Sequence, residues 1–185
     1  MIRLFIMQYR RNQIEGGSYF FTVNLAERKQ RLLIEHIETL REAIRTVRKG
    51  HPFQIDAIVI MPGHLHAIFT LPPGDADYSM RWMLIKAGFS RHIPKQERIN
   101  ASRRSKGERG VWQRRFWEHT LRNEEDFRHH VDYIHYNPVK HGYVSRPVDW
   151  PYSSIHQYIR AGILTTDWGA ASPENDKKFG ERRLG

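Results

Sequence analysis

Four segments of the chain are rich in β-branched and aromatic residues and are bounded by turn residues, a pattern typical of short β-strands. Pro62-Gly63 is a tight-turn signal between the second and the third segment, so these two segments predict a hairpin. The predicted strands are residues 18–24, 53–61, 64–71 and 112–121.

Apolar residues three or four positions apart predict an amphipathic helix over residues 32–49, which ends at Gly50, and a second helix over residues 78–92. A third helix is expected to begin after Asn123, whose side chain can cap it. Its first turn is acidic, as the helix dipole favours. This helix should run to residue 136 or 137, where Pro138 ends or kinks it. A shorter helix is expected before residue 160.

The predicted order is strand, helix, strand, strand, helix, strand, helix. It indicates the α+β class, with a ferredoxin-like antiparallel sheet that carries helices on one face, and with the last helix as an addition. We expect one domain over residues 1–165, with a basic loop at 91–115, and a polar tail over residues 166–185.

The composition excludes several classes of protein. The 185 residues are 39% hydrophobic, which suits a folded domain, and the longest apolar runs are far too short to cross a bilayer. The start of the chain has no signal-peptide pattern, so we expect a cytoplasmic protein without membrane association. The absence of cysteine excludes disulfides and thiolate metal sites and fits a reducing compartment.

Charge is the strongest signal in the composition. The net charge of +10 predicts a polyanionic partner, and residues 91–115 carry nine basic and two acidic side chains. Such a run is often only a solvated loop. Here aromatic residues flank it, and basic groups beside rings suit single-stranded nucleic acid. Trp112, Phe116 and Trp117 are interpreted first as core residues, with base platforms as the alternative.

Two motifs carry possible chemistry. His64 and His66 are two apart in a predicted strand, so both imidazoles should face one side of the sheet and could hold one divalent ion, unless they are incidental. Tyr133 and Asn137 are four apart on a predicted helix and share a face. A tyrosine hydroxyl can attack a DNA phosphodiester, although a half-buried packing ring is the simpler interpretation. Tyr136 is the rival nucleophile.

Several blocks of sequence resemble one known family. Pro62-Gly-His64-Leu-His66 resembles the His-hydrophobic-His motif of HUH nucleases. The blocks at residues 112–119, 131–142 and 149–154 resemble, in order, those of the REP-associated tyrosine transposases, which belong to the single-tyrosine HUH transposases. The similarity also includes the first predicted strand and spans roughly residues 15 to 170.

The resemblance implies a metal-dependent transposase that cleaves and rejoins single-stranded DNA at hairpins of repetitive extragenic palindromes. It implies Tyr133 as the nucleophile, and His64, His66 and Asn137 as ligands of Mg²⁺ or Mn²⁺. Asparagine stands where the broader family often has glutamine. The active form could be a monomer or a homodimer. Two alternatives remain, a non-catalytic hairpin-binding module and a nuclease that uses water. The residues expected to bind DNA are Arg103, Arg104, Lys106, Arg109, Arg114, Arg115 and Lys140.

Overall fold

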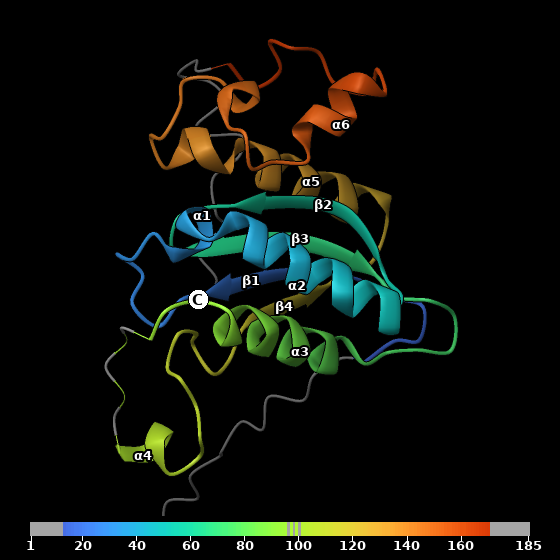
Figure 1. The fold of residues 1–185 in the computed structure, drawn as a ribbon. Helices are drawn as coiled ribbons and strands as arrows, with labels where there is room; N and C mark the ends of the chain where they lie inside the picture. The colour runs from blue at the N-terminus through green and yellow to red at the C-terminus, as the bar shows by residue number, and fades with distance from the viewer. Residues whose placement is uncertain (1–12, 96, 98, 100, 171–185) are drawn as a thin grey trace, which may run out of the picture.

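A four-stranded antiparallel sheet lies at the centre of the computed structural model, which describes residues 13–95, 97, 99 and 101–170 (Figure 1). The strand order is β2-β3-β1-β4, and helices connect β1 to β2 and β3 to β4. This is the ferredoxin-like arrangement, so the predicted fold class is confirmed. The strands are β1 (Ser18–Asn24), β2 (Gln54–Ile60), β3 (His64–Thr70) and β4 (Trp117–Thr120).

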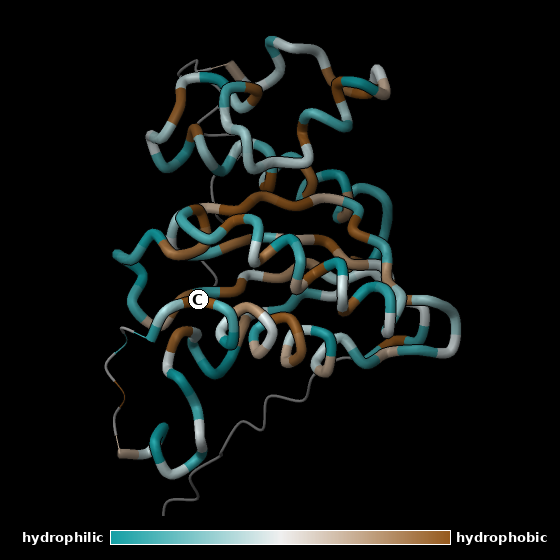
Figure 2. Tube along the Cα trace, in the orientation of Figure 1, coloured by the Kyte–Doolittle hydropathy of each residue, from teal (hydrophilic) through white to brown (hydrophobic). Residues whose placement is uncertain are grey.

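Helices α2 (Ile37–Gly50) and α3 (Tyr78–Arg91) cover one face of the sheet (Figure 1). Alternate residues of β1 and β3 point into this layer, and the tube in Figure 2 shows the hydrophobic strands between more polar loops. Phe69 stacks on Trp82 with ring centroids 4.7 Å apart, and Phe21 lies against the same tryptophan at 5.4 Å. All three rings are fully buried, which makes this layer the main hydrophobic core.

Helix α5 (Glu124–Lys140) covers the opposite face, with η1 (Pro147–Asp149) and α6 (Ile155–Arg160) beyond it (Figure 1). The C-terminal segment is tied to β2, because the Trp150 indole donates to the Ile60 carbonyl at 3.0 Å and the Ser154 amide donates to the Ile58 carbonyl at 2.8 Å. The added helix therefore forms a second layer on the face that α2 and α3 leave open.

Three predicted boundaries are wrong. The helix predicted at 32–49 is divided at His36 into α1 (Leu32–Glu35) and α2. The fourth strand is shorter than predicted, since the segment before β4 makes only an isolated bridge between Trp112 and Leu25. Helix α5 passes through Pro138, because proline removes a single amide donor and the His141 amide still donates to the Asn137 carbonyl at 3.0 Å.

The basic stretch and the start of the predicted tail are both partly described by the structure. A one-turn helix, α4 (Ala101–Arg104), lies within the basic stretch, and Arg98 of that stretch falls outside the described residues. Within the predicted tail, the ring of Trp168 lies 6.1 Å from that of His135 on α5. The rest of the predicted tail, residues 171–185, lies outside the described residues.

Candidate active site

His64 and His66 lie on β3, a central strand, and point to the face that α5 covers. Their ring centroids are 5.1 Å apart, and 8% and 4% of the two residues are exposed. Leu65 between them belongs to the core on the other face. The alternation of side chains along a strand therefore brings the two imidazoles together, as predicted from their spacing.

The turn before His64 needs glycine. A Cβ atom at Gly63 would lie 2.2 Å from the main-chain oxygen of Arg28, and the Gly63 carbonyl accepts a hydrogen bond from the Leu25 amide at 2.9 Å. Because only glycine allows this close approach, the turn holds the end of β3, and with it His64, against the segment that follows β1.

His66 is held as a neutral imidazole. Burial lowers its pKa well below the ordinary value, and electrostatic interactions with His64, His141, Lys140 and Arg28 lower the pKa further. Its Nδ1 atom lies 2.9 Å from the Thr22 hydroxyl on β1. With Thr22 Oγ1 accepting the Nδ1 proton, the lone pair of Nε2 is left for a ligand, an arrangement that is common among metal-binding histidines.

Tyr133, on α5, lies against this pair within the same chain. Its ring centroid is 5.2 Å from that of His66, in an edge-on arrangement, and 5.8 Å from that of Phe20. The Lys140 ammonium lies 5.0 Å from the centroid of the tyrosine ring. Helix α5 thus places the Tyr133 ring beside the imidazole of His66, and the Lys140 ammonium beside the Tyr133 ring.

Asn137 is fully buried on α5, one helical turn after Tyr133. Neither its amide nitrogen nor its amide oxygen has a hydrogen-bond partner among the residues that the structure describes. A buried amide without a partner costs about 1–3 kcal/mol, so such a group calls for a ligand or a water. Imidazole nitrogens and an amide oxygen are donor types that suit a divalent cation, so these residues fit a metal by their chemistry.

Tyr136 occupies a different environment. It is 2% exposed, and a Cβ atom added at Gly169 would meet its ring at 3.4 Å, which places the ring against the C-terminal segment. Tyr133, rather than Tyr136, is therefore the tyrosine beside the histidine pair.

Comparison with known proteins shows to which family the chain is similar. A sequence model of the family described as "Transposase IS200 like" matches residues 5–137. The chain is 45% identical, over 175 residues, to the REP-associated tyrosine transposase of Escherichia coli strain K12, covering 95% of this chain and 97% of the relative. This chain belongs to the REP-associated tyrosine transposases. A solved structure of a REP-associated tyrosine transposase bound to a REP hairpin is 44% identical, with a TM-score of 0.77 over 96% of this chain and 99% of that chain.

Membership of this family confirms the resemblance seen in the sequence and the enzyme class, a transposase. None of the helices described for this transposase is long and apolar enough to span a lipid bilayer.

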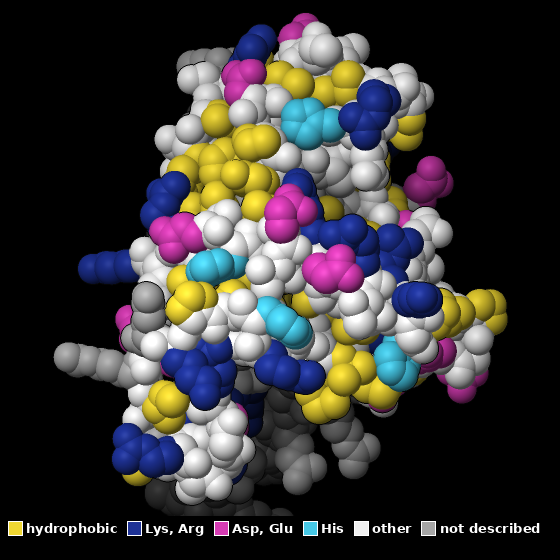
Figure 3. All heavy atoms as spheres, in the orientation of Figure 1, with side chains coloured by type: hydrophobic (Ala, Val, Ile, Leu, Met, Phe, Trp, Pro, Cys, Tyr) yellow, Lys and Arg dark blue, Asp and Glu magenta, His cyan; other side chains and the backbone are white. Residues whose placement is uncertain are grey.

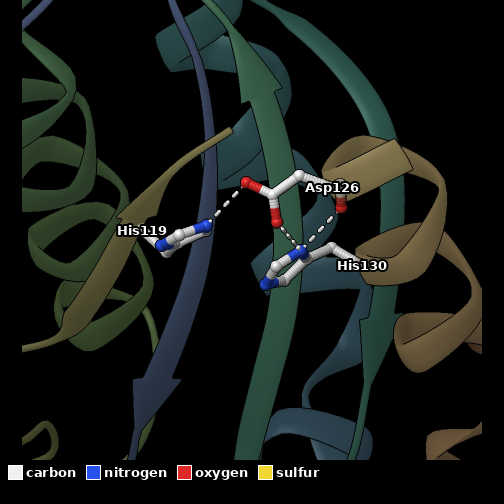
Figure 4. Close-up of side chains that lie close together, drawn as sticks. All are labelled: His119, Asp126 and His130. Atoms are coloured by element: carbon white, nitrogen blue, oxygen red, sulfur yellow. Dashed lines mark hydrogen bonds and ion pairs between the residues drawn. The ribbon is translucent and has the colours of Figure 1, made fainter. Parts of the chain in front are cut away.

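A second cluster of polar side chains lies on the same face of the transposase sheet. Figure 4 shows His119 of β4 and His130 of α5 directed at the carboxylate of Asp126, with N–O distances of 2.9 and 3.1 Å. His130 Nδ1 also lies 2.8 Å from the Asp126 carbonyl oxygen. These groups are close enough to hold a cation. However, both imidazoles can donate to Asp126, so hydrogen bonds satisfy the cluster without one.

The sequence did not predict this cluster. His119 and His130 are both partly buried in the structure. The spacing of four between Asp126 and His130 was the available signal, and only the packing of α5 on the sheet adds His119.

The basic segment of the transposase lies beside α3, on the other side of the sheet from Tyr133, and borders a hollow of about 640 Å³. In Figure 3, Lys and Arg side chains appear over the α4 region and along α2, with acidic side chains among them. Arg109 pairs with Glu97 at 2.6 Å and also donates to the carbonyls of Ser90, Ile93 and Pro94. This arginine therefore holds the segment to the end of α3.

The other residues predicted to bind DNA fall into two groups. Arg103 donates to the Trp112 carbonyl at 3.1 Å, and Arg114 pairs with Glu108 at 2.9 Å, so both also shape the segment. The second group has exposed side chains, except for one residue that lies beside Tyr133. These residues are Arg104, Lys106, Arg115 and Lys140.

Proposed function

We propose that this transposase cleaves and rejoins single-stranded DNA at hairpins of repetitive extragenic palindromes, through a covalent bond between Tyr133 and the DNA. The observation that carries the proposal is the position of the Tyr133 ring, 5.2 Å from the ring of His66 in the same chain. The hairpin substrate is supported by the REP hairpin that the related transposase binds in its solved structure.

The proposed reaction is a reversible transesterification. The Tyr133 oxygen attacks the scissile phosphorus, a phosphorus–oxygen bond to tyrosine forms, and the bond to the 3′ oxygen of the neighbouring nucleotide breaks. The phenol gives up its proton and the departing 3′ oxygen gains one. The products are a 5′-phosphotyrosine and a free 3′ hydroxyl. Attack by a 3′ hydroxyl reverses these steps, so rejoining needs no nucleotide cofactor.

His64, His66 and Asn137 would hold the divalent cation, Mg²⁺ or Mn²⁺. When bound, the ion polarises the phosphate and stabilises the charge that develops on it. The residues fit this task, because His66 is neutral and the Asn137 amide has no other partner among the described residues. Since Tyr133 lies beside His66 within one chain, we propose that a monomer can cleave.

The basic side chains would bind the backbone of the DNA. Lys140 lies beside Tyr133, where its charge can attract the scissile phosphate. Arg104, Lys106 and Arg115 are exposed and suit contacts to phosphates further along the DNA, while Arg103, Arg109 and Arg114 hold the segment that presents them.

The experiment uses a labelled single-stranded DNA with a palindromic hairpin and a short unpaired flank, incubated with the protein and Mn²⁺. Denaturing electrophoresis should show a covalent protein–DNA adduct. Tyr133→Phe should abolish the adduct and keep DNA binding. Tyr136→Phe is the matched control, because the Tyr136 ring packs away from the histidines, and it should form the adduct normally.

Two other outcomes would identify the alternatives. Cleavage that survives Tyr133→Phe would show that water is the nucleophile. Hairpin binding with neither adduct nor cleavage, at any concentration of Mg²⁺ or Mn²⁺, would show a binding module without chemistry.

A further inference from the structure

Trp117 at the start of β4 is an exposed aromatic ring next to the active site. It is 37% exposed, although most tryptophan rings in this fold are buried. Its register partner on β1 is Thr22, the residue that contacts His66. Its ring lies edge-on to Phe20 at 5.6 Å, and Phe20 in turn contacts both His66 and Tyr133. A single ring therefore separates Trp117 from the catalytic tyrosine.

The ring of Trp117 continues into an ordered row of parallel rings. The plane of the His119 ring is nearly parallel to the plane of the Trp117 ring, with an interplanar angle of 5° and a centroid distance of 5.9 Å. His119 in turn stacks on His130 at 4.9 Å and 20°. The Asp126 carboxylate fixes both imidazoles (Figure 4). The side chains of His119 and His130, which Asp126 holds in place, therefore support one side of the Trp117 ring.

The two other aromatic residues of this region have different roles. Trp112 is 7% exposed, and its indole donates to the Lys86 carbonyl at 3.2 Å. Phe116 packs against Phe21, with ring centroids 5.8 Å apart, on the α3 face. Both belong to the core. Only Trp117 of the three presents a large ring to solvent on the face that carries the histidine pair.

We infer that Trp117 is a stacking platform for an unpaired base of the DNA strand next to the scissile phosphate. This inference rests on the proposed function, which brings single-stranded DNA to Tyr133. An exposed ring next to a nucleic-acid site suits a base, because every base has an aromatic face, whatever its sequence. Arg115, exposed two residues before Trp117, adds a positive charge that suits the backbone of the same nucleotide.

The test is a double-mutant cycle on the dissociation constant, in which one change is made in the protein and the other in the DNA. A hairpin with an unpaired flank is prepared with an abasic residue at each flanking position in turn, and its dissociation constant is measured for the wild-type protein and for Trp117→Ala. Loss of a base–aromatic stack weakens binding about 5- to 150-fold. At one position, the abasic residue should weaken wild-type binding by this factor and should have almost no effect on Trp117→Ala.

Matched variants separate stacking from a general effect of the substitution. Trp117→Phe keeps an aromatic face and should keep most of the affinity. Ile163→Ala removes another exposed apolar side chain, beyond α6, and should change nothing. Circular dichroism and thermal melting show whether Trp117→Ala remains folded. If it does not, Trp117→Leu replaces Trp117→Ala as the variant without an aromatic face, and Trp117→Phe remains the control that keeps one.

The outcomes distinguish this inference from the proposed function. If the wild type forms the adduct, but every abasic position affects wild type and Trp117 variants equally, the platform is refuted and the transesterase stands. If the cycle shows coupling at one position, but no adduct forms, the platform stands and the chemistry is refuted.

Discussion

The two faces of the sheet use alternate residues of the same strands, yet they bury different kinds of side chain. On the face covered by α2 and α3, β3 places Leu65 and Phe69 among close-packed aromatic rings. On the face covered by α5, the same strand places His64 and His66, with Tyr133 packed edge-on. Both faces contain a cluster of buried apolar residues, and the α5 face also carries the candidate site residues. Because side chains alternate, a shift of register by one residue would exchange the two.

The largest effect should come from removing a metal ligand on the α5 face. His66→Ala should lower the rate of adduct formation about 1000-fold or more, since a catalytic ion contributes several kcal/mol to the barrier. Hairpin binding by the folded protein should change little, and the rate is divided by the folded fraction, because the substitution empties a buried site. His92→Ala, which removes an exposed histidine at the end of α3, is the matched control. An equal loss of rate in His66→Ala and His92→Ala would contradict the assignment of His66 as a metal ligand.

The opposite result is expected on the α3 face. Trp82→Ala should lower the free energy of unfolding by about 3–5 kcal/mol, because it empties a fully buried site, while the folded fraction should form the adduct at the normal rate. Urea denaturation measures the first quantity and a single-turnover assay the second. Trp82→Phe offers a milder variant. A loss of rate that exceeds the loss of folded protein would show that the two faces are not separable.

Asn137 sharpens the comparison, because it is buried on the active face without a partner among the described residues. Asn137→Ala should raise the Mn²⁺ concentration needed for half-maximal rate about 10- to 100-fold. Without metal, the variant should be no less stable than the wild type, because no hydrogen bond is lost. Strong destabilisation of the metal-free variant, with unchanged metal dependence, would show a purely structural amide.

The smallest effect concerns His135, on the side of α5 that faces the C-terminal segment. Burial lowers its pKa to about 3, and Nε2 lies 2.9 Å from the Ser154 hydroxyl. The unfolded chain binds the proton near pH 6.5, so stability is present above that pH and is lost as pH falls from 6.5 towards 3. This one group should remove about 2 kcal/mol at pH 5. His135→Gln should flatten this part of the stability profile measured by denaturant melts. An unchanged slope would contradict the assignment.

Local patterns in the sequence predicted most of the fold and which candidate site residues share a face. Strand alternation placed His64 and His66 on one face, and helix periodicity placed Tyr133 with Asn137. The wrong boundaries lie where tertiary contacts act against local preference. The aromatic segment before β4 is held by the indole hydrogen bond of Trp112 to α3, and not by a strand ladder.

Contacts between the side chains of different elements could not be predicted. Asp126 joins His119 to His130 because the short connection between β4 and α5 brings the first turn of the helix to the end of the strand, and the spacing of the residues does not give that geometry. In the same way, Trp112, Phe116 and Trp117 are equivalent as aromatic residues in the sequence. The face of the sheet on which each one lies decides which are core and which is exposed.

The most direct test of the central claim is to locate the covalent bond. The adduct formed on hairpin DNA with Mn²⁺ is digested with nuclease and protease, and the peptide that spans both tyrosines of α5 is fragmented in a mass spectrometer. The account predicts a phosphonucleotide on Tyr133 and an unmodified Tyr136. A nucleotide on Tyr136, or on any residue away from the His64–His66 pair, would contradict it.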